Sequence, residues 1–404
     1  MGRRASRREA RQCAAQPRPS SQEEIALKTP AITERILARA RPAIRALQPY
    51  QPGKPVAELE RELGVREAVK LASNENPRGP GPAVHEALAR AAHELNRYPD
   101  GNGFELKQAL ARRLGVHMDM ITLGNGSNDV LELLGRVFVG PGDRGIVDAH
   151  SFVVYPLAIT SSGGELVRVP SRHYGHDLEA MAAAVDERSR ILFIANPNNP
   201  TGTRVTRSEV ETLLASVPDD LIVVLDEAYF EYVAEEDHPD GISLLAAHPN
   251  LVVTRTFSKI HGLAALRMGY AVSSPAIADL LNRLRQPFNA NAMAQAAAVA
   301  ALEDADYMAE SRRLNDEGMA VLTAAFDERQ LPYIPSVGNF VTLEVGDGAA
   351  VYDALLREGV IVRPIAGYGL PRHVRVTVGT AEENARFLAA LDRVLDVRAA
   401  GTRD

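Results

Sequence analysis

Apolar segments of two kinds alternate along the middle of the chain, from residue 105 to about residue 275. Segments with an apolar residue every three or four positions predict helices, and short runs of consecutive apolar residues predict buried strands. Strands that alternate with helices of this size indicate crossover connections and a mostly parallel sheet covered on both faces. The helices are predicted at 105–116, 127–138, 178–185 and 208–217, and the strands at 120–124, 143–150, 165–170, 190–197, 221–229 and 251–258.

The pattern changes beyond the alanine-rich segment 291–305. A long helix with a polar face is predicted over about 303–329, and shorter strands and helices follow it. This mixture predicts a smaller α+β domain after the larger α/β domain. The later elements are predicted as a strand at 339–345, a helix at 349–359, strands at 360–365 and 373–379, and a last helix from Ala381.

The N-terminal region differs from both. Its first 30 residues are rich in arginine and contain no apolar segment, which predicts a disordered tail rather than a secretory signal. Helical spacing of Ile, Leu and Ala follows, and Pro52 and Pro55 then require an extended passage. The predicted organisation is a tail (1–30), an N-terminal arm joining the small domain (31–72), a large domain (73–295) and a small C-terminal domain (296–404).

Composition narrows the classes of protein to consider. A chain of 404 residues with 46% hydrophobic and 24% charged residues is typical of a globular protein with two domains. Its net charge of -7 gives no reason to expect nucleic acid or an anionic membrane as a partner, and no apolar run is long enough to span a bilayer. The single cysteine, Cys13, excludes a disulfide or a cysteine metal site within the chain and fits a cytoplasmic protein; no metal is expected.

Polar residues follow several of the predicted strands. In open parallel sheets, ligands bind beyond the carboxyl ends of the strands. The helix start after the strand at 120–124 can bind an anion such as phosphate, or can be an ordinary helix cap. An acid follows the apolar run at 221–225, and burying its charge costs much free energy unless a positive partner compensates it. The polar residues at these strand ends are Ser127 and Asn128, Asn199, Asp226 and Tyr229, and Thr256, Ser258, Lys259 and Arg267.

Taken alone, Lys259 and Arg267 would be ordinary surface charges. Pyridoxal 5′-phosphate (PLP), however, requires the whole set: a lysine for its aldehyde, a carboxylate for its ring nitrogen, donors for its 3′ oxygen, and a helix N-terminus with hydroxyls and an arginine for its phosphate. Motifs for other chemistry are missing, since no GxGxxG opens a first βαβ unit and neither GxxxxGK[ST] nor GxSxG occurs. The sequence therefore predicts a PLP site.

Six longer motifs appear in an order typical of one known family. They are LASNENPRGP, NRYPDG, ANPNNPTG, VLDEAYFEY, RTFSKIHGLAALRMGY and VRVTVGT. From about Leu47 to the last helix, the chain resembles the fold-type I, aspartate-aminotransferase-like enzymes and, within them, the histidinol-phosphate aminotransferases. The resemblance implies an α/β large domain with a mostly parallel seven-stranded sheet, together with the smaller α+β domain.

The resemblance also implies roles at the cofactor. Lys259 would bind PLP covalently and then carry the proton of transamination, while Asp226 would pair with the pyridinium nitrogen. Asn199 and Tyr229 would bind the 3′ oxygen. Phe152 lies where the family has an aromatic residue stacked on the ring, commonly Tyr. The phosphate would be bound by the backbone amides of Ser127 and Asn128, by Thr256 or Ser258, and by Arg267.

On the substrate side, the resemblance implies that Arg375 binds the carboxylate of glutamate. Arg363 and Tyr50 would help to bind the distal phosphate of histidinol phosphate, and Asn339 matches a family position that lines the substrate pocket. Tyr98 would reach the cofactor phosphate of a neighbouring subunit. A homodimer with shared active sites is therefore expected.

The expected reaction is transamination between L-histidinol phosphate and 2-oxoglutarate, which gives imidazole-acetol phosphate and L-glutamate, in histidine biosynthesis. An aromatic amino-acid aminotransferase and a phosphothreonine decarboxylase of similar fold stay open as alternatives, because paired arginines accept anions without specifying the side chain between them. A non-catalytic regulator would need an added DNA-binding region or a lost lysine, and neither is seen. His261 is interpreted as helix packing, because Lys259 already supplies the proton transfer.

Overall fold

The computed structural model describes residues 32–49 and 53–401. The predicted tail over 1–30 and the predicted substrate residue Tyr50 lie outside these residues. The residue boundaries of the predicted domains stay a prediction.

The chain divides into two compact units, residues 1–48 and residues 49–404. The described part of the first unit forms a helix over 32–39 and a second short helix, α2 (Pro42–Ala46), as the apolar spacing predicted. Pro42 begins α2, where its missing N–H leaves no intrahelical hydrogen bond unmade.

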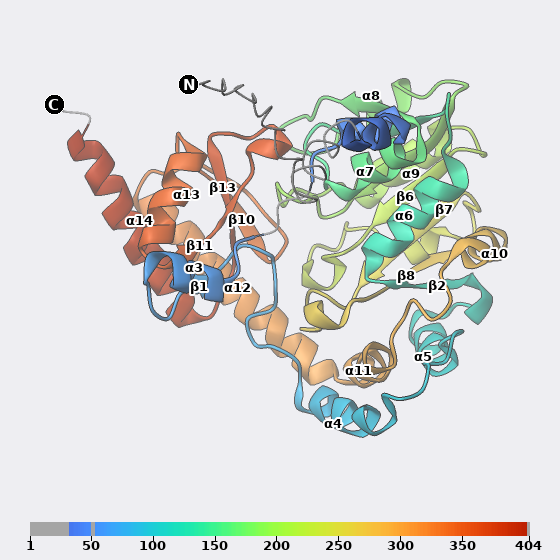
Figure 1. Cartoon of the computed structure of the whole chain (residues 1–404), viewed down its shortest axis with the longest axis horizontal. Coiled ribbons are helices and arrows are strands. Elements are labelled where there is room, and N and C mark those ends of the chain that lie inside the picture. Colours follow the sequence, from blue (N-terminus) through green and yellow to red (C-terminus); the bar gives the residue numbers. More distant parts are fainter. Residues whose placement is uncertain (1–31, 50–52, 402–404) are drawn as a thin grey trace, which may run out of the picture. The chain divides into compact units, whose positions relative to one another are not determined.

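A seven-stranded sheet in the second unit confirms the predicted α/β class (Figure 1). Its strand order is β2-β8-β7-β6-β5-β3-β4, and its neighbours are parallel except for β8, which runs antiparallel to both β2 and β7. The hydrophobic pattern did not predict β8. The strands are β2 (Ile121–Asn125), β3 (Arg144–Asp148), β4 (Glu165–Val169), β5 (Ser189–Ala195), β6 (Ile222–Asp226), β7 (Leu251–Thr256) and β8 (Met268–Ser273).

Helices cover both faces of this sheet, because successive residues of a strand point to opposite faces. Ile194 and Leu225 pack on one face, and Phe193 and Val224 pack on the other. The first face is covered by α4 (Pro82–Ala91), α5 (Phe104–Leu114), α8 (Leu178–Ala183), α9 (Arg207–Ser216) and α11 (Ala292–Glu303). The second face is covered by α6 (Ser127–Phe138), α7 (Val154–Ser162) and α10 (Pro275–Leu284).

The C-terminal part of the chain has the predicted α+β character. A four-stranded antiparallel sheet has the order β12-β13-β10-β9, and β1 pairs in parallel with β11. These strands are β1 (Val69–Lys70), β9 (Tyr333–Ile334), β10 (Phe340–Glu344), β11 (Val360–Ile361), β12 (Arg363–Pro364) and β13 (His373–Thr377). The accompanying helices are α3 (Val56–Leu63), α12 (Ala305–Glu328), α13 (Gly348–Arg357) and α14 (Ala381–Gly401).

Two local predictions need correction. The strand predicted over 360–365 divides at Val362, because β11 pairs with β1 whereas β12 pairs with β13. In addition, no α-helix follows Lys259: the chain turns at Gly262, which has φ 71, forms a 3₁₀ turn over Ala264–Leu266 and returns as β8. β7 and β8 are antiparallel neighbours, so the connection between them turns back along the sheet.

Candidate active site

A cavity of about 190 Å³ lies at the carboxyl ends of β5, β6 and β7. It brings together most of the site residues predicted from the sequence, as expected for the edge at which parallel strands end. The predicted residues that line it are Ser127, Asn128, Phe152, Asn199, Asp226, Tyr229, Thr256, Ser258, Lys259, Arg267 and Arg375. It is also lined by residues that sequence reasoning missed, which include Asn74, Tyr155 and Tyr368.

Asp226 is the last residue of β6 and is 4% exposed. The Tyr155 hydroxyl donates to its Oδ2 at 2.6 Å, and the Thr254 hydroxyl donates to its Oδ1 at 2.8 Å. Burial raises the pKa of Asp226, whereas these two hydrogen bonds and the charge of Lys259 oppose the rise. The two donors fix the orientation of the carboxyl group in the cavity wall and favour its charged form.

Lys259 follows β7, and its ammonium Nζ donates to the backbone oxygen of Ser73 at 3.2 Å. Burial lowers the pKa of this amine to about 7, and the nearby positive charge of Arg375 adds to the effect. A substantial fraction of the amine is therefore neutral near neutral pH. A neutral, desolvated lysine is the form that attacks a carbonyl carbon.

Tyr229 and Asn199 form a third group in the cavity. Asn74 donates from Nδ2 to the Tyr229 hydroxyl at 2.9 Å, and Arg375 donates to Oδ1 of Asn199. Burial raises the pKa of Tyr229 to about 12, so its phenol keeps its proton. Because Asn74 occupies the hydroxyl as an acceptor, the Tyr229 proton is available for a bound acceptor.

The N-terminus of α6 forms an anion site with Arg267. Arg267 donates from Nη1 to the Ser258 hydroxyl at 3.1 Å, beside the first residue of α6, Ser127. A Cβ atom on Gly126 would lie 2.4 Å from Nη2 of Arg267, and one on Gly269 would lie 2.2 Å from the Ser127 nitrogen. Only glycine permits this approach of the guanidinium and the helix N–H groups, an arrangement that suits a phosphate.

The donors and acceptors of the cavity fit PLP. The carboxylate of Asp226 and the amine of Lys259 come from neighbouring strands of one sheet, since Asp226 pairs in register with Thr254 of β7. The phosphate partners surround the start of α6, and the phenol and amide lie on Tyr229 and Asn199. Phe152 lines the same cavity, in edge contact with Tyr155 at 5.7 Å between ring centroids.

Three other predicted residues lie outside the lining of this cavity. Asn339 is buried behind it and donates to the backbone oxygen of Asn74 at 3.0 Å, so it contacts the cavity wall indirectly. Arg363 pairs in register with Arg375 on the neighbouring strand. Tyr98 is 81% exposed and stacks on Phe288, with 4.7 Å between ring centroids.

Tyr155 and Thr254 are the clearest omissions from the sequence prediction. Tyr155 lies three residues after Phe152, in α7, a helix that the apolar pattern did not predict. Thr254 lies in β7, and a residue of a buried strand that faces the neighbouring carboxylate is recognisable only once the strand order is known. The acid at the end of β6 was the signal in the sequence that such donors exist, because a buried carboxylate requires hydrogen-bond donors.

His261 does not enter the chemistry of the cavity. Its imidazole is 4% exposed and packs against Phe257 with 4.9 Å between ring centroids. Burial lowers its pKa to about 3, so the ring is neutral. The packing interpretation holds, although His261 belongs to a turn rather than to a helix.

A buried ion pair lies beside the cavity, formed by the residues that follow Asp226 and Thr254 along their strands. Arg255 donates from Nε and Nη2 to the Glu227 carboxylate at 2.9 and 2.7 Å, and from Nη2 to Asp240 at 2.8 Å. Glu227 is fully buried, and the Arg255 guanidinium compensates its charge. These contacts fix the ends of β6 and β7 relative to each other.

The class of protein follows from fold and sequence together. Residues 66–391 match the family of class I and II aminotransferases. The structure of Thermus thermophilus aspartate aminotransferase with maleate matches with a TM-score of 0.76 over 88% of this chain and 99% of that one; at 22% identity this likeness concerns the fold. The class is that of the fold-type I, PLP-dependent aminotransferases.

Closer relatives define the family. The chain is 57% identical over 362 residues to histidinol-phosphate aminotransferase 2 of Pseudomonas aeruginosa, covering 89% of this chain and 98% of that protein. The crystal structure of histidinol-phosphate aminotransferase from Sinorhizobium meliloti in complex with pyridoxal-5′-phosphate matches with a TM-score of 0.83 and 32% identity, over 89% of this chain and 98% of that one. The chain belongs to the histidinol-phosphate aminotransferase family.

Proposed function

We propose that the protein catalyses PLP-dependent transamination between L-histidinol phosphate and 2-oxoglutarate. The main support for this proposal is that one cavity is lined by Lys259, Asp226 and Arg375. PLP, when bound, supplies an aldehyde that accepts the amino group and a ring that withdraws electrons from the reacting carbon. The names and high identity of the relatives support histidinol phosphate as the amino donor.

The chain's own residues hold and move protons around the cofactor. Lys259 would hold PLP through its aldehyde carbon and would carry a proton at the reacting carbon. Asp226, oriented by Tyr155 and Thr254, keeps a proton at the ring nitrogen. Tyr229 and Asn199 donate to the 3′ oxygen.

Other residues position the cofactor. Phe152 lines the cavity, where it would cover one face of the ring and exclude water from the reacting carbon. The first N–H groups of α6 would hold the phosphate, because the helix dipole there favours negative charge. Its partners are Ser127, Asn128, Thr256, Ser258 and Arg267.

Arg375 binds the carboxylate of glutamate and 2-oxoglutarate. Its side chain is 5% exposed and anchored to the Ala72 backbone oxygen at 2.7 Å and to Asn199, so it is rigid before substrate arrives. Arg363, on the adjacent strand, and Tyr50 assist with the distal phosphate. Asn339 acts on the substrate pocket through Asn74.

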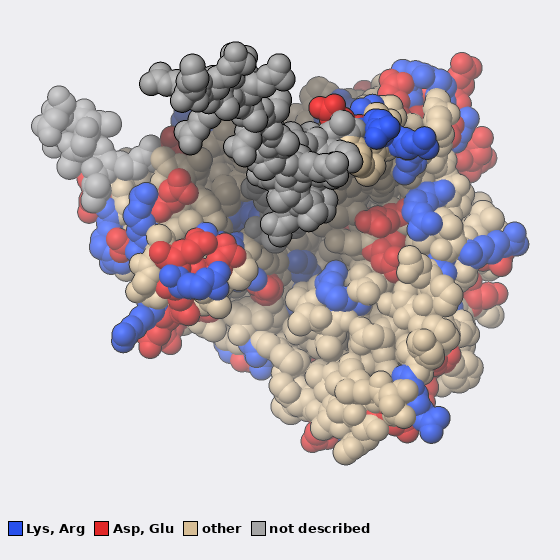
Figure 2. All heavy atoms as spheres, viewed as in Figure 1, with Lys and Arg blue, Asp and Glu red and all other residues tan. Residues whose placement is uncertain are grey.

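The working form is a homodimer in which Tyr98 completes the partner's phosphate site. Exposed apolar side chains on a protein surface mark interaction sites, and Leu95, Tyr98, Phe104 and Phe288 are 43–81% exposed. Figure 2 shows few charged side chains over α4 and α11 on the face in view. Sedimentation of Phe288→Ser should show dissociation to monomers, whereas an undisturbed dimer would contradict this interface.

The proposed location is the cytoplasm. The proposed reaction uses glutamate and 2-oxoglutarate, which are small metabolites. The single cysteine of the chain fits a reducing compartment. No helix within residues 32–49 and 53–401 is long and apolar enough to cross a membrane.

Half-reaction kinetics test the function. The aminated holoenzyme is mixed with imidazole-acetol phosphate and, separately, with phenylpyruvate, and the second-order rate constants are compared. A larger constant for imidazole-acetol phosphate is expected, and a clear preference for phenylpyruvate would indicate an aromatic aminotransferase. Lys259→Ala should abolish turnover and the visible absorbance of covalently bound PLP; full activity in this variant would refute the mechanism.

A further inference from the structure

Tyr368 enters the Lys259 cavity from the C-terminal part of the chain. It ends a 3₁₀ turn, Ala366–Tyr368, in the loop that joins β12 to β13. These two strands carry Arg363 and Arg375. Tyr368 is half-buried, whereas its neighbours Ala366, Gly367 and Gly369 are exposed, so the phenol is the part of this loop that faces the cavity.

Tyr368 lines the cavity together with Tyr229 and with Arg375, the proposed partner of the substrate carboxylate. It is close enough to Tyr229 to contribute to the rise of the Tyr229 pKa, and Arg375 lines the same space. A tyrosine hydroxyl can both donate and accept a hydrogen bond. It can therefore pair with either nitrogen of an imidazole ring, whereas a phenyl ring offers it no partner.

His150 contacts the backbone of this turn. Its Nδ1 lies 2.6 Å from the backbone oxygen of Tyr368. A carbonyl oxygen only accepts, so Nδ1 carries the hydrogen. Gly369, which follows Tyr368, has φ 79 and lies next to the His150 ring. His150 thus links the loop after β3, which also carries Phe152, to the loop that carries Tyr368.

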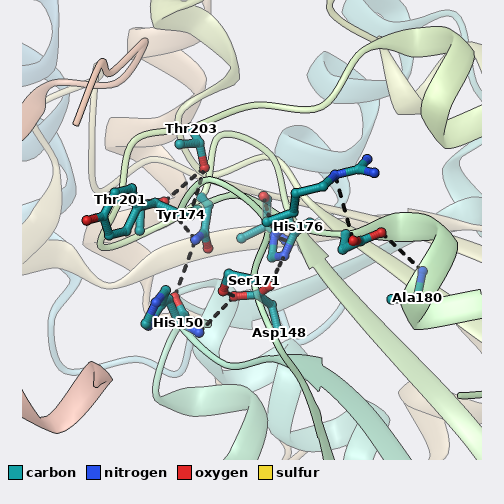
Figure 3. A network of polar contacts seen from close by, with 12 residues as sticks. Asp148, His150, Ser171, Tyr174, His176, Ala180, Thr201 and Thr203 are labelled. Atoms are coloured by element: carbon teal, nitrogen blue, oxygen red, sulfur yellow. Dashed lines mark hydrogen bonds and ion pairs between the residues drawn. The ribbon is translucent and has the colours of Figure 1, made fainter. Parts of the chain in front are cut away.

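A network of polar contacts fixes His150 (Figure 3). Its backbone N–H donates to Asp148 Oδ1 at 2.7 Å, and its backbone oxygen accepts from Asn198 at 3.3 Å. Ser171 donates to the same oxygen of Asp148 at 2.6 Å, and the ring of Tyr174 stacks on His150 at 6.3 Å. Asp148 is fully buried at the end of β3, so the network is anchored in the seven-stranded sheet.

From these contacts we propose that Tyr368 is a specificity-determining residue and that His150 is the positioning residue that holds it at the cavity. The inference rests on the proposed function, because it assigns to the Tyr368 hydroxyl the recognition of the imidazole ring of the substrate. A site that hydrogen-bonds its substrate discriminates against an analogue that lacks the polar group, since the hydrogen bond to the substrate is then lost.

The experiment uses the aminated holoenzyme and compares second-order rate constants for imidazole-acetol phosphate and phenylpyruvate. Tyr368→Phe and His150→Ala should each lower the ratio of the two constants by about tenfold, as expected for one hydrogen bond. The rate constant for phenylpyruvate should stay unchanged. His150→Asn keeps an N–H donor and should restore part of the ratio. Tyr174→Leu is the control, because it removes the ring contact but leaves the hydrogen bond.

PLP affinity and the thermal midpoint are measured for every variant, since a merely structural defect would change these and both rate constants together. An unchanged ratio in Tyr368→Phe or in His150→Ala would overturn the proposal, and so would equal behaviour of His150→Ala and His150→Asn. A wild-type enzyme that prefers phenylpyruvate would refute the proposed function instead. The two failures are therefore distinguishable.

Discussion

Replacement of Tyr155 by Phe should weaken Asp226 as the partner of the cofactor's ring nitrogen. The hydroxyl of Tyr155 is one of two side-chain donors to this carboxylate, at 2.6 Å, and the other is Thr254 at 2.8 Å. The ring of Tyr155 is fully buried and stacks on Phe193, with 4.8 Å between centroids and 5° between planes. Phe should keep this packing and lose only the hydroxyl.

The magnitude follows from the charge on the acceptor. A hydrogen bond to a charged group contributes about 1.5–3 kcal/mol. Burial already raises the pKa of Asp226, and the loss of Tyr155 raises it further, so the carboxylate form that holds the ring proton is less favoured. If all of this energy is lost in the transition state, the rate of transamination falls by about 10- to 150-fold.

Single-turnover kinetics with glutamate, followed by the absorbance of bound cofactor, measure this effect. Thr254→Val should slow the reaction to a similar extent, because it removes the second donor. Tyr333→Phe is a matched control that removes a hydroxyl near Asp327, and it should stay within about twofold of wild type. A Tyr155→Phe enzyme as fast as this control would show that the hydrogen bond does not act on the ring nitrogen.

Three further predictions concern the amine, the ion pair and the anion site. PLP capture by the apoenzyme, measured by stopped-flow absorbance, should rise with pH to a plateau with its midpoint near 7 rather than 10.5, because only the neutral Lys259 amine attacks; a rate that keeps rising well above neutral pH would contradict this. Arg255→Met should lower the free energy of unfolding by about 3–5 kcal/mol in urea, because it leaves Glu227 buried and unpaired. The pair of the exposed Arg172 with the half-buried Asp177, tested by Arg172→Met, should contribute less than about 1 kcal/mol, and equal losses would refute the distinction. Gly126→Ala should weaken PLP binding at least about tenfold in a fluorescence titration, because its Cβ would lie 2.4 Å from Arg267. Gly142→Ala, at φ 95 with no atom within 4 Å, isolates the effect of backbone strain, and a similar change in PLP affinity there would contradict the steric argument.

Much of the site was predictable from the sequence because of one property of parallel sheets. Asp226 and Lys259 follow apolar runs that form neighbouring strands, and parallel strands end at the same edge. Local patterning is therefore enough to predict that the acid, the amine and the start of α6 lie in one region. The mostly parallel sheet and the α+β character of the C-terminal part followed from the same periodicities.

Contacts between distant segments were decided by the tertiary structure. Tyr155 reaches Asp226 across 71 positions of sequence, and His150 reaches Tyr368 across 218. No periodicity encodes such pairs, because they depend on strand order and on how the seven-stranded and four-stranded sheets of the second unit are arranged. The antiparallel β8 escaped prediction for a related reason: its pairing with β2 and β7, rather than its own sequence, makes it a strand. The local sequence therefore determines which reactive side chains the site contains. The tertiary structure determines which residues hydrogen-bond to them and shift their pKa values.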